Sequence, residues 1–575
     1  MASNELIDIH NHGVVVDPLK QKVKCNYCDK VVSSGFYRLK YHLGGIKGDV
    51  SPCSEVPVHV KEVFRIELAE KKRKRLVEIE ESKPAKLRSQ LKRKSVIHID
   101  KAYGNDANAH IDRLEGQITD HIPSFEELKG WISKDKLITM QKYVEEIKIS
   151  WETTGCSILL DTWTDSQDRK LINILVNCPK GAIYLKSYDI STLMRDVDAM
   201  QLFIEEVIQD VGIKNVVQII TNSMSIFMEV VGQQIMAKHK HIFWTIGVST
   251  CIELMLKKFK TMNRIRKVLG KAESIAKFIH NHATTLKDLG VSDFIHNPIN
   301  PSKVRSIVSY LTLENTLSKK DILECFFASD DWKTSNLSNS PEGERVAALV
   351  RSSSFWNRAT VAMKASSPLL HELHLLKGNN KPQTGYIYEK IDQLKETIEE
   401  KLERNVSHYM PFWEAIDEIW NNYFHSSLFS AGYYLNPILF YSNNFKCDLE
   451  VVEGLSACIV RMGGEDYGIR ASIRDQAVKY LMAKRSSSKH AMNQPPNSSP
   501  VLWWWEYAAE YPELSRIAIR ILSQTCDGAS KFNLNRNLAE MLTSEKRQTE
   551  QQMLTDYAFI HYNMQLRNFD SDIGP

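Results

Sequence analysis

The feature that most constrains the fold is a set of cysteines and a histidine near the amino terminus, in KCNYCDKVVSSGFYRLKYHLGGIKGDVSPC (residues 24–53). Cys25 and Cys28 form a C-x-x-C pair, a spacing that lets two thiolates reach one tetrahedral zinc ion at about 2.3 Å each. His42 and Cys53 follow and complete a Cys3His set. A segment this small cannot bury enough core to fold alone, so metal affinity becomes folding energy. The sequence therefore predicts one structural zinc site with these four ligands.

Other interpretations of the C-x-x-C pair are a redox motif and an accidental spacing. A thioredoxin-like redox site needs a βαβ frame, which the flanking residues do not supply. Between the pair and the histidine, SSGFYRLKYHL (33–43) predicts a turn and then a short helix. In that helix Phe36 and Leu39 would pack against the pair, while Arg38 and Lys40 stay exposed. These residues favour the zinc interpretation.

Positive charge is concentrated at the amino-terminal end. Residues 20–53 hold seven Lys and Arg against two Asp, and residues 71–94 hold eleven against three Glu, in a chain of net charge +4. The remainder of the chain is therefore acidic. This asymmetry is typical of a polyanion-binding end on a globular body, although the second run could also be a solvated linker. KKRKR at 71–75 and KRK at 92–94 also fit a nuclear import signal, so we expect a nuclear protein.

Length and composition indicate a large intracellular protein. At 66.0 kDa, with 43% hydrophobic residues, the chain can form two to four domains, each with its own core. No run of about 18 apolar residues appears, so we expect no membrane span. The first residues lack the charged-then-apolar pattern of a secretion signal. The seven cysteines outside the predicted site are solitary, which suits buried thiols in a reducing compartment.

The middle of the chain shows the pattern of a mixed sheet. Three short apolar runs split by polar turns predict an antiparallel meander. Alternating strands and helices follow, and this element order is that of the RNase H-like fold. The predicted strands are 156–163, 171–178, 182–190, 216–223 and 242–247, and the predicted helices are 200–212, 226–239 and 250–259.

The predicted zinc segment, VKCNYCDKVV…GFYRLKYHL…PC, resembles the BED-type zinc finger at the amino terminus of plant hAT-type transposases and of genes derived from them. In that family the finger binds DNA. Further stretches resemble the same family over most of residues 15–565, among them HIFWTIGVSTCIELMLKKF (241–259) and VLWWWEYAAEYPELSRIAIRILSQTC (501–526). The resemblance implies a domesticated, transposase-derived protein.

The resemblance also implies the architecture. We expect a multidomain α/β protein with an RNase H-like core that a large all-helical insertion interrupts. The expected parts are a BED-type zinc finger (15–60), a basic linker (61–120), the first part of the RNase H-like core (121–255), the helical insertion (256–500) and a C-terminal hAT dimerisation region completing the core (501–568).

DNA contact is expected from the finger, because a short helix bearing basic side chains suits a DNA groove. Neutralised phosphates would make the affinity fall with salt. The basic run at 71–94 would add to this binding. We expect zinc as the cofactor and no small-molecule substrate. The predicted DNA contacts are Lys20, Lys22, Lys24, Arg38 and Lys40.

The family's catalytic acids are incomplete in this chain. In the RNase H-like fold, carboxylates on the first strand, after the fourth strand and on a later helix hold two Mg²⁺ ions that act on a phosphodiester. Asp161 matches the first position, but Asn222 stands at the second. An ungapped register puts Phe532 at the third. Asp161 is then interpreted as a remnant or a turn-capping residue.

Other acids could take over only in a different register. Asp527 and Glu540 are the two carboxylates near the third position. Gly247 and Thr250 replace a cysteine and a histidine of the family pattern. Because several parts of the site are missing together, the sequence predicts a protein without catalysis.

An apolar helix face near the carboxyl end has two interpretations. Apolar residues recur there at i, i+3, i+4, i+7 and i+8, and such a stripe is usually core. The family places its dimerisation region here, which implies a homodimer or a heterodimer with related proteins. The residues of this face are Leu514, Ile517, Ala518, Ile521 and Leu522.

Three functions stay open. The sequence favours a DNA-binding, hAT-derived protein without catalysis, acting as a nuclear transcriptional regulator and as a dimer. The second is an active transposase that carries out strand transfer with divalent metal. The third is a protein-interaction scaffold that does not bind DNA.

Overall fold

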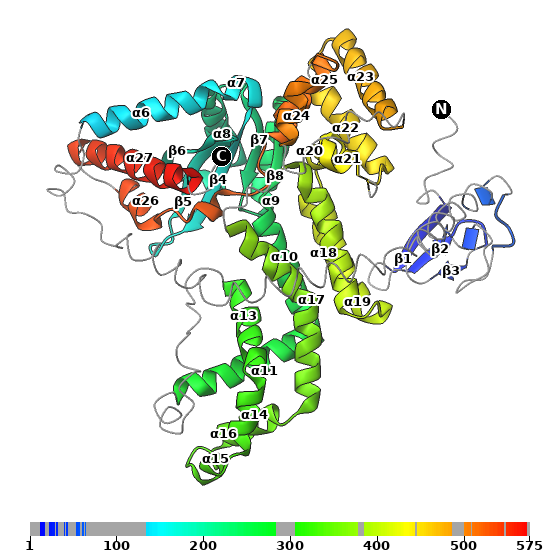
Figure 1. Cartoon of the computed structure of the whole chain (residues 1–575), viewed down its shortest axis with the longest axis vertical. Helices are drawn as coiled ribbons and strands as arrows, with labels where there is room; N and C mark the ends of the chain where they lie inside the picture. The colour runs from blue at the N-terminus through cyan, green and yellow to red at the C-terminus, as the bar shows by residue number, and fades with distance from the viewer. Residues whose placement is uncertain are drawn as a thin grey trace. The chain divides into compact units, whose positions relative to one another are not determined.

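The chain forms two compact units, Met1–His121 and Ile122–Pro575 (Figure 1). The computed structural model describes part of each unit. In the first unit the described residues are 12–17, 22–28, 30–32, 39–40, 42–43, 53–57, 60–61 and 64. In the second they are 134–282, 305–377, 384–442, 445–485, 499–507, 509–544 and 548–571. Lys20, Arg38, the basic run at 71–94 and nearly all of the predicted linker (61–120) lie outside the described residues.

The first unit contains a small antiparallel sheet in the order β1-β2-β3. Its strands are β1 (Gly13–Asp17), β2 (Lys22–Cys25) and β3 (Val31–Val32). Residues of β2 alternate between the two faces of the sheet, so one face is buried and the other carries lysines. The buried face packs in a core of Val23, Cys25, Val32, Leu39, Leu43, Cys53, Val56, Val60 and Phe64.

The second unit is built around a five-stranded sheet in the order β6-β5-β4-β7-β8. β4 pairs antiparallel with β5 and β5 with β6, whereas β7 runs parallel to β4 and β8 parallel to β7. The antiparallel meander and the later strands predicted from the sequence are confirmed. The strands are β4 (Cys156–Thr164), β5 (Lys170–Cys178), β6 (Gly181–Asp189), β7 (Val216–Thr221) and β8 (Phe243–Ile246).

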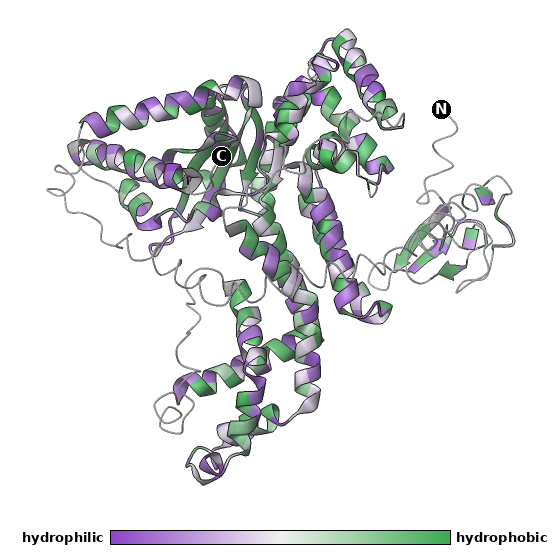
Figure 2. Ribbon diagram, in the orientation of Figure 1, coloured by the Kyte–Doolittle hydropathy of each residue, from purple (hydrophilic) through white to green (hydrophobic). Residues whose placement is uncertain are grey.

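Helices cover this sheet on both faces, which explains why its strands are almost continuously apolar. Ile158 and Leu160 of β4 pack with α8 and α9, while Leu159 between them faces the opposite core, which contains α26 and α27. Figure 2 shows the green, hydrophobic strands between helices that carry purple, hydrophilic surfaces. The helices of this part are α6 (Lys134–Ile149), α7 (Trp151–Thr154), η2 (Leu193–Arg195), α8 (Val197–Val211), α9 (Ile226–Lys238), α26 (Arg536–Leu542) and α27 (Gln548–Ser571).

Between β8 and α24, every element in the described residues is helical. Those that follow β8 are α10 (Val248–Thr261), α11 (Asn263–Asn281), α13 (Arg305–Ser318), α14 (Lys320–Ala328), α15 (Asp330–Thr334), α16 (Pro341–Val350) and α17 (Ser353–Lys377). The next are η4 (Thr384–Tyr386), α18 (Ile387–Lys401), α19 (Val406–Ile419), η5 (Trp420–Phe424), α20 (Ser427–Leu435), α21 (Pro437–Phe440), α22 (Leu449–Met462) and α23 (Tyr467–Arg485). Among the helices described, none combines the length and the apolar character that crossing a membrane requires.

The carboxyl-terminal segment contributes to two cores. Its first helices, α24 (Pro500–Glu506) and α25 (Pro512–Leu522), pack with α20 to α23. After η6 (Ala529–Phe532) the chain returns to the sheet, where α26 and α27 cover one face. The last two helices of this segment therefore supply the packing on one face of the sheet.

The predicted dimerisation residues lie in α25, within the core of the chain itself. Each of the five is no more than 5% exposed, and they pack among the aromatic side chains of Trp503, Trp504 and Tyr480. Their position agrees with the simpler interpretation of the apolar face, that of ordinary core. Because these five side chains are buried within one chain, contacts between the two chains of a dimer would have to involve other residues. The five are Leu514, Ile517, Ala518, Ile521 and Leu522.

Candidate functional site

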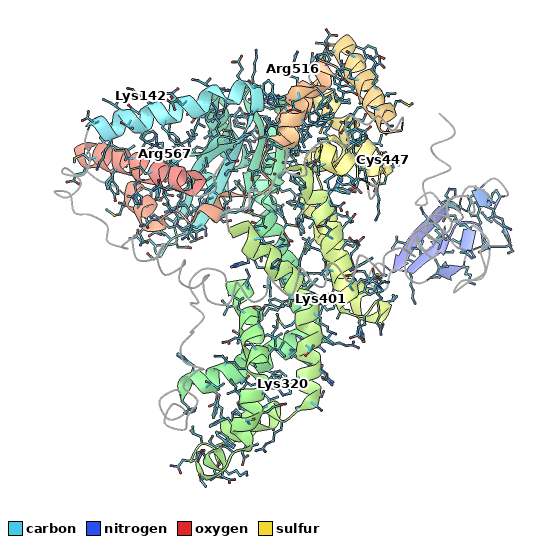
Figure 3. All side chains as sticks on the ribbon, viewed as in Figure 1. Lys142, Lys320, Lys401, Cys447, Arg516 and Arg567 are labelled. Carbon is cyan, nitrogen blue, oxygen red and sulfur yellow. The ribbon has the colours of Figure 1, made fainter. Side chains whose placement is uncertain are left out.

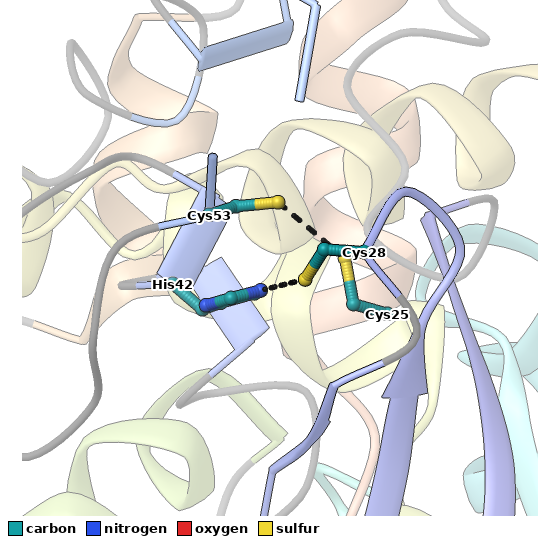
Figure 4. A group of neighbouring side chains, drawn as sticks. All are labelled: Cys25, Cys28, His42 and Cys53. Carbon is teal, nitrogen blue, oxygen red and sulfur yellow. Dashed lines mark hydrogen bonds between the residues drawn. The ribbon is translucent and has the colours of Figure 1, made fainter. Parts of the chain in front are cut away.

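The four predicted zinc ligands come together in the first unit (Figure 4). Their ligand atoms all lie within 4.8 Å of one another. The Sγ atoms of Cys25 and Cys53 are 4.0 Å apart, and the Cys28 Sγ lies 3.1 Å from the His42 Nε2. Zn–S bonds of about 2.3 Å in a tetrahedron place two sulfurs about 3.8 Å apart. The arrangement therefore fits a single tetrahedral metal ion, and the 4.0 Å separation is far beyond the length of a disulfide bond.

Backbone hydrogen bonds hold this cluster in place. Cys25 ends β2, and its N–H donates to the carbonyl of Lys30 at 2.8 Å, which closes the turn that carries Cys28. The N–H of Tyr27 points to the Cys25 Sγ at 3.5 Å. The N–H of Cys53 donates to the carbonyl of His42 at 2.8 Å. This last bond places Cys53 beside the other ligands despite the ten residues that separate it from the histidine.

The cluster is buried, which affects its protonation. Cys25, His42 and Cys53 are no more than 4% exposed. Without a metal, burial raises the pKa of the Cys53 thiol to about 11. A metal ion has to displace this proton to gain the thiolate, so metal affinity falls as the pH falls.

His12, just before β1, and Gly13, the first residue of β1, support the cluster, a role that the sequence analysis missed. His12 shares a 2.6 Å hydrogen bond with the hydroxyl of Tyr27, and its ring meets Phe64 edge-on. At Gly13, a Cβ would lie 2.5 Å from Leu39 and 2.8 Å from Val23. Only glycine fits there without displacing the small core. The signal in the sequence that could have indicated this role is the His-Gly pair at the start of the apolar run GVVV.

Three of the predicted DNA contacts are among the described residues. Lys22 and Lys24 alternate with the buried Val23 and Cys25, so they lie on the outer face of the small sheet. Lys40 follows the buried Leu39 and is half-buried, with its Nζ 6.0 Å from the centre of the Phe64 ring. The other two, Lys20 and Arg38, lie outside the described residues.

A second site lies in the large sheet, where the predicted first catalytic position is found. Asp161 is 6% exposed and pairs with Asn173 within the β4–β5 ladder. Asn222 follows β7, the parallel neighbour of β4, and its Nδ2 donates to the Asp161 carboxylate at 2.9 Å. The predicted proximity of the two residues is therefore confirmed. The suggestion that Asp161 caps a turn is wrong, because this residue lies inside a strand.

The amide of Asn222 is fully used by its neighbours. Its Oδ1 accepts from the N–H and the hydroxyl of Thr162, at 2.9 and 2.7 Å. Its Nδ2 donates to the carbonyl of Thr162 at 3.0 Å as well as to Asp161. The amide oxygen therefore faces Thr162, and the amide nitrogen faces both the carbonyl of Thr162 and the carboxylate of Asp161.

The third member of this group is an arginine. Arg536, the first residue of α26, places its guanidinium 3.5 Å from the Asp161 carboxylate and 5.2 Å from the centre of the Trp163 ring. Phe532 lies four residues earlier, buried in the core under the sheet. Phe532, the residue that the ungapped register puts at the third acid position, therefore lies in the core, and Arg536 is the residue of this segment beside Asp161. Burial raises the pKa of Asp161, and the nearby Arg536 charge acts against that shift.

The two acids considered as substitutes have other partners. Asp527 is fully buried and accepts hydrogen bonds from the N–H and hydroxyl of Ser249, at 3.1 and 2.8 Å. Glu540 contacts the Trp163 indole N–H at 3.4 Å. Among the described residues, the only cluster of three or more Cys, His, Asp or Glu side chains close enough to hold a metal ion is the one in the first unit.

At position 247, where the family pattern has a cysteine, the packing leaves no room for a side chain. A Cβ at this position would lie 2.8 Å from the backbone nitrogen of Gly528. The start of α10 therefore approaches the segment after α25 more closely than a side chain allows. A cavity of about 590 Å³ opens beside this region, and Asn222, Thr250, Lys257 and Arg536 are among its lining residues.

Three family models match the chain. A BED-like zinc finger matches residues 18–66, a domain of unknown function, DUF659, matches 123–275, and the hAT family C-terminal dimerisation region matches 479–564. No curated protein matches the chain. The finger match contains all four metal-ligand candidates, and the second match contains the large sheet. The chain therefore carries the features of hAT transposases.

Removing one ligand should abolish metal binding. We expect the purified full-length protein to contain one zinc ion per chain and Cys28→Ser to contain none, because three ligands cannot complete the tetrahedron. Cys325→Ser is the control, since Cys325 is an exposed cysteine of the second unit. Zinc per chain is measured by plasma mass spectrometry. A Cys28→Ser protein that keeps its zinc would contradict the site.

Restoring a carboxylate beside Asp161 should destabilise the second unit. We expect Asn222→Asp to lower the free energy of unfolding at pH 7 by about 2–3 kcal/mol, because a donor to Asp161 becomes a like charge. The repulsion raises the pKa of the pair, so the loss should shrink as the pH falls and one carboxyl gains a proton. Added Mn²⁺ should also reduce it. Chemical denaturation measures all three effects.

The matched control exchanges the two side chains. Asp161→Asn with Asn222→Asp keeps one carboxylate and one amide at the site, so it should recover most of the lost stability. A single Asn222→Asp variant as stable as the wild type at pH 7 would show that the amide contributes little.

Proposed function

We propose that this protein is a zinc-dependent DNA-binding protein derived from a hAT transposase, and that it regulates transcription in the nucleus as a dimer without cutting or joining DNA. The observation that carries the proposal is the buried Cys3His cluster within a match to a BED-like zinc finger. A Cys3His donor set with these separations is one that zinc takes in structural sites. We assign zinc as its metal, held by Cys25, Cys28, His42 and Cys53.

Charge supports DNA as the partner of the finger. Lysines alternate with core residues along β2, and Lys40 lies next to the buried Leu39, so cationic side chains surround a rigid metal-supported core. Cations held on such a frame suit phosphate contacts, while a helix can reach base edges in a groove. The basic runs of the sequence favour a nuclear location.

The large sheet supports descent from a transposase. Its strand order, with two antiparallel pairings followed by two parallel ones, supports the RNase H-like fold that the sequence predicts. We infer that residues 121–255, together with α26 and α27, form such a core. The long helical stretch between β8 and α24 is then the insertion.

The absence of catalysis is proposed from the site that Asp161, Asn222 and Arg536 form, which we call the strand-end site; the cavity beside Asn222 and Arg536 is the strand-end cavity. Mg²⁺ prefers oxygen ligands and gives up its hydration reluctantly. Next to Asp161 the chain presents the amide N–H of Asn222 and the guanidinium of Arg536, which are hydrogen-bond donors. A donor and a fixed positive charge disfavour a divalent cation at this carboxylate, and among the described residues no metal-binding cluster includes Asp161.

Dimerisation is proposed from the match of residues 479–564 to the hAT dimerisation region. The apolar side chains of α25 are used in the core, so the contacts between chains would involve exposed residues. Among the described residues of the matched range, the most exposed large apolar side chains are Leu502 at 58%, Met482 at 52% and Trp505 at 50%. Two fingers in one dimer would favour paired half-sites in DNA.

Charge reversal in the finger tests the DNA-binding proposal. We expect Arg38→Glu with Lys40→Glu to abolish specific binding to a DNA site selected with the wild-type protein, because two phosphate or base contacts become repulsive. Zinc per chain should stay at one, which separates lost contact from lost folding. Fluorescence anisotropy with a labelled duplex measures the affinity. Unchanged specific binding would move the DNA surface away from this helix.

A strand-transfer assay tests the proposed lack of catalysis. We expect purified protein with Mg²⁺ or Mn²⁺ to leave the DNA ends that it binds intact and unjoined. Asp161→Ala is the matched control. Cleavage or joining that disappears in this variant would establish the active transposase instead, whereas activity that persists in it would indicate a contaminant.

A further inference from the structure

A second concentration of positive charge lies far from the amino-terminal end, in α10 and α11. Residues 257–281 hold eight Lys and Arg against a single acid, Glu273. This stretch belongs to the part of the chain that is acidic as a whole. Its charge is therefore local, and the fold determines which of these side chains reach the surface.

α11 separates its apolar and charged residues by face. The apolar residues pack in the core of the helical region, and no large apolar side chain of α11 is exposed. The cations lie outside this face, where four are exposed and Lys271 is half-buried. We call this surface the α11 basic face, and its residues are Arg264, Arg266, Lys267, Lys271 and Lys277.

The lysines at the end of α10 have structural partners. Lys258 forms a 2.6 Å ion pair with Glu418, and Lys260 donates to Ser309 at 2.6 Å and lies 3.8 Å from Glu273. By contrast, among the described residues no carboxylate lies within 4.0 Å of a cation of the α11 basic face. Like charges three and four residues apart destabilise a helix slightly. Intramolecular stability therefore does not explain this face.

We propose that the α11 basic face binds the phosphate backbone of duplex DNA. The proposal rests on the proposed function and adds to it a second contact surface in the body of the protein. A helix of 19 residues is about 28 Å long, which corresponds to about eight base pairs at 3.4 Å each. Because α11 exposes no large apolar side chain, it lacks the hydrophobic face with which a helix enters a membrane.

Positive charge also reaches the strand-end cavity. Lys257, on the helix before α11, lines this cavity together with Arg536. Lys170 also lines the cavity, and Glu253 is the acidic residue of this lining, so the cations outnumber the acids there.

The two surfaces would have different roles. Contacts from side chains to phosphates position a protein and add affinity for any sequence, whereas contacts to base edges select a sequence. The cations of the α11 basic face suit contacts to phosphates, so they would add affinity for DNA of any sequence. The finger would supply specificity.

Salt-dependent binding of the full-length protein tests the proposal. Fluorescence anisotropy with a labelled duplex is measured over a range of NaCl concentrations. We expect Lys267→Glu with Lys271→Glu to weaken binding to all duplexes alike and to lower the slope of log K against log salt by about 2, since each phosphate contact contributes about 0.9. Glutamate has a helix propensity close to that of lysine, so α11 should keep its fold.

The control reverses two exposed lysines outside α11. Lys142→Glu, on α6 (Figure 3), with Lys180→Glu, in the turn between β5 and β6, changes the net charge by the same amount. This control should bind as the wild type does. Equal weakening in both double variants, or none in the α11 variant, would overturn the proposal. Loss of binding to an acidic polypeptide without loss of DNA binding would also overturn it.

A finger variant separates this proposal from the proposed function. Cys28→Ser should lose specific binding and keep a weak, salt-sensitive binding, which the two α11 substitutions then remove. If Cys28→Ser loses all DNA binding and the α11 variant loses none, the α11 proposal fails and the finger stands. If the wild type binds no duplex at any salt concentration, both fail.

Discussion

The second unit depends on the burial of both faces of its central strands. β4 and β7 lie side by side in the middle of the sheet, and a strand in that position needs a packed layer above and below it. The chain supplies one layer immediately with α8 and α9, but the other comes from α26 and α27, more than 300 residues after β7. The residues between α9 and α26 therefore have to bring the chain back to the sheet. The helical region accordingly begins and ends beside the sheet.

A buried polar network fixes where the chain returns. Gln218 of β7 donates to the hydroxyl of Ser157 and to the carbonyl of Thr525, and the Ser157 hydroxyl donates to Gln524. These side chains are buried, where an unpaired polar group is costly, so the bonds hold the segment after α25 in one register. Arg520 adds a bond to the backbone after α8. The same segment then leads through η6 to Arg536 at the strand-end site.

The sequence predicted the local features well and the long-range ones poorly. The spacing of Cys25, Cys28 and His42 was enough to predict the metal cluster, because these ligands are near one another in the chain. The strands were predictable because their apolar runs are short and separated by turns. The contact between Arg536 and Asp161 was not predictable, because it joins residues far apart in the chain and depends on the path of the chain through η6 between α25 and α26. The positive charge of α11 is visible in the sequence, but only the fold shows that its apolar residues are buried and that most of its cations are exposed.

The strand-end site also gives Asp161 a structural role, whether or not it acts in catalysis. A buried carboxylate is costly unless hydrogen bonds and a nearby positive charge compensate it. Here Asn222 donates to it and Arg536 lies beside it, so the site contains its own compensation. Replacing Asp161 by an apolar residue would leave an amide N–H of Asn222 without its acceptor and Arg536 without its counter-charge. The three side chains now depend on one another, and Asp161 is best understood as a structural residue that joins the ends of β4, β7 and α26.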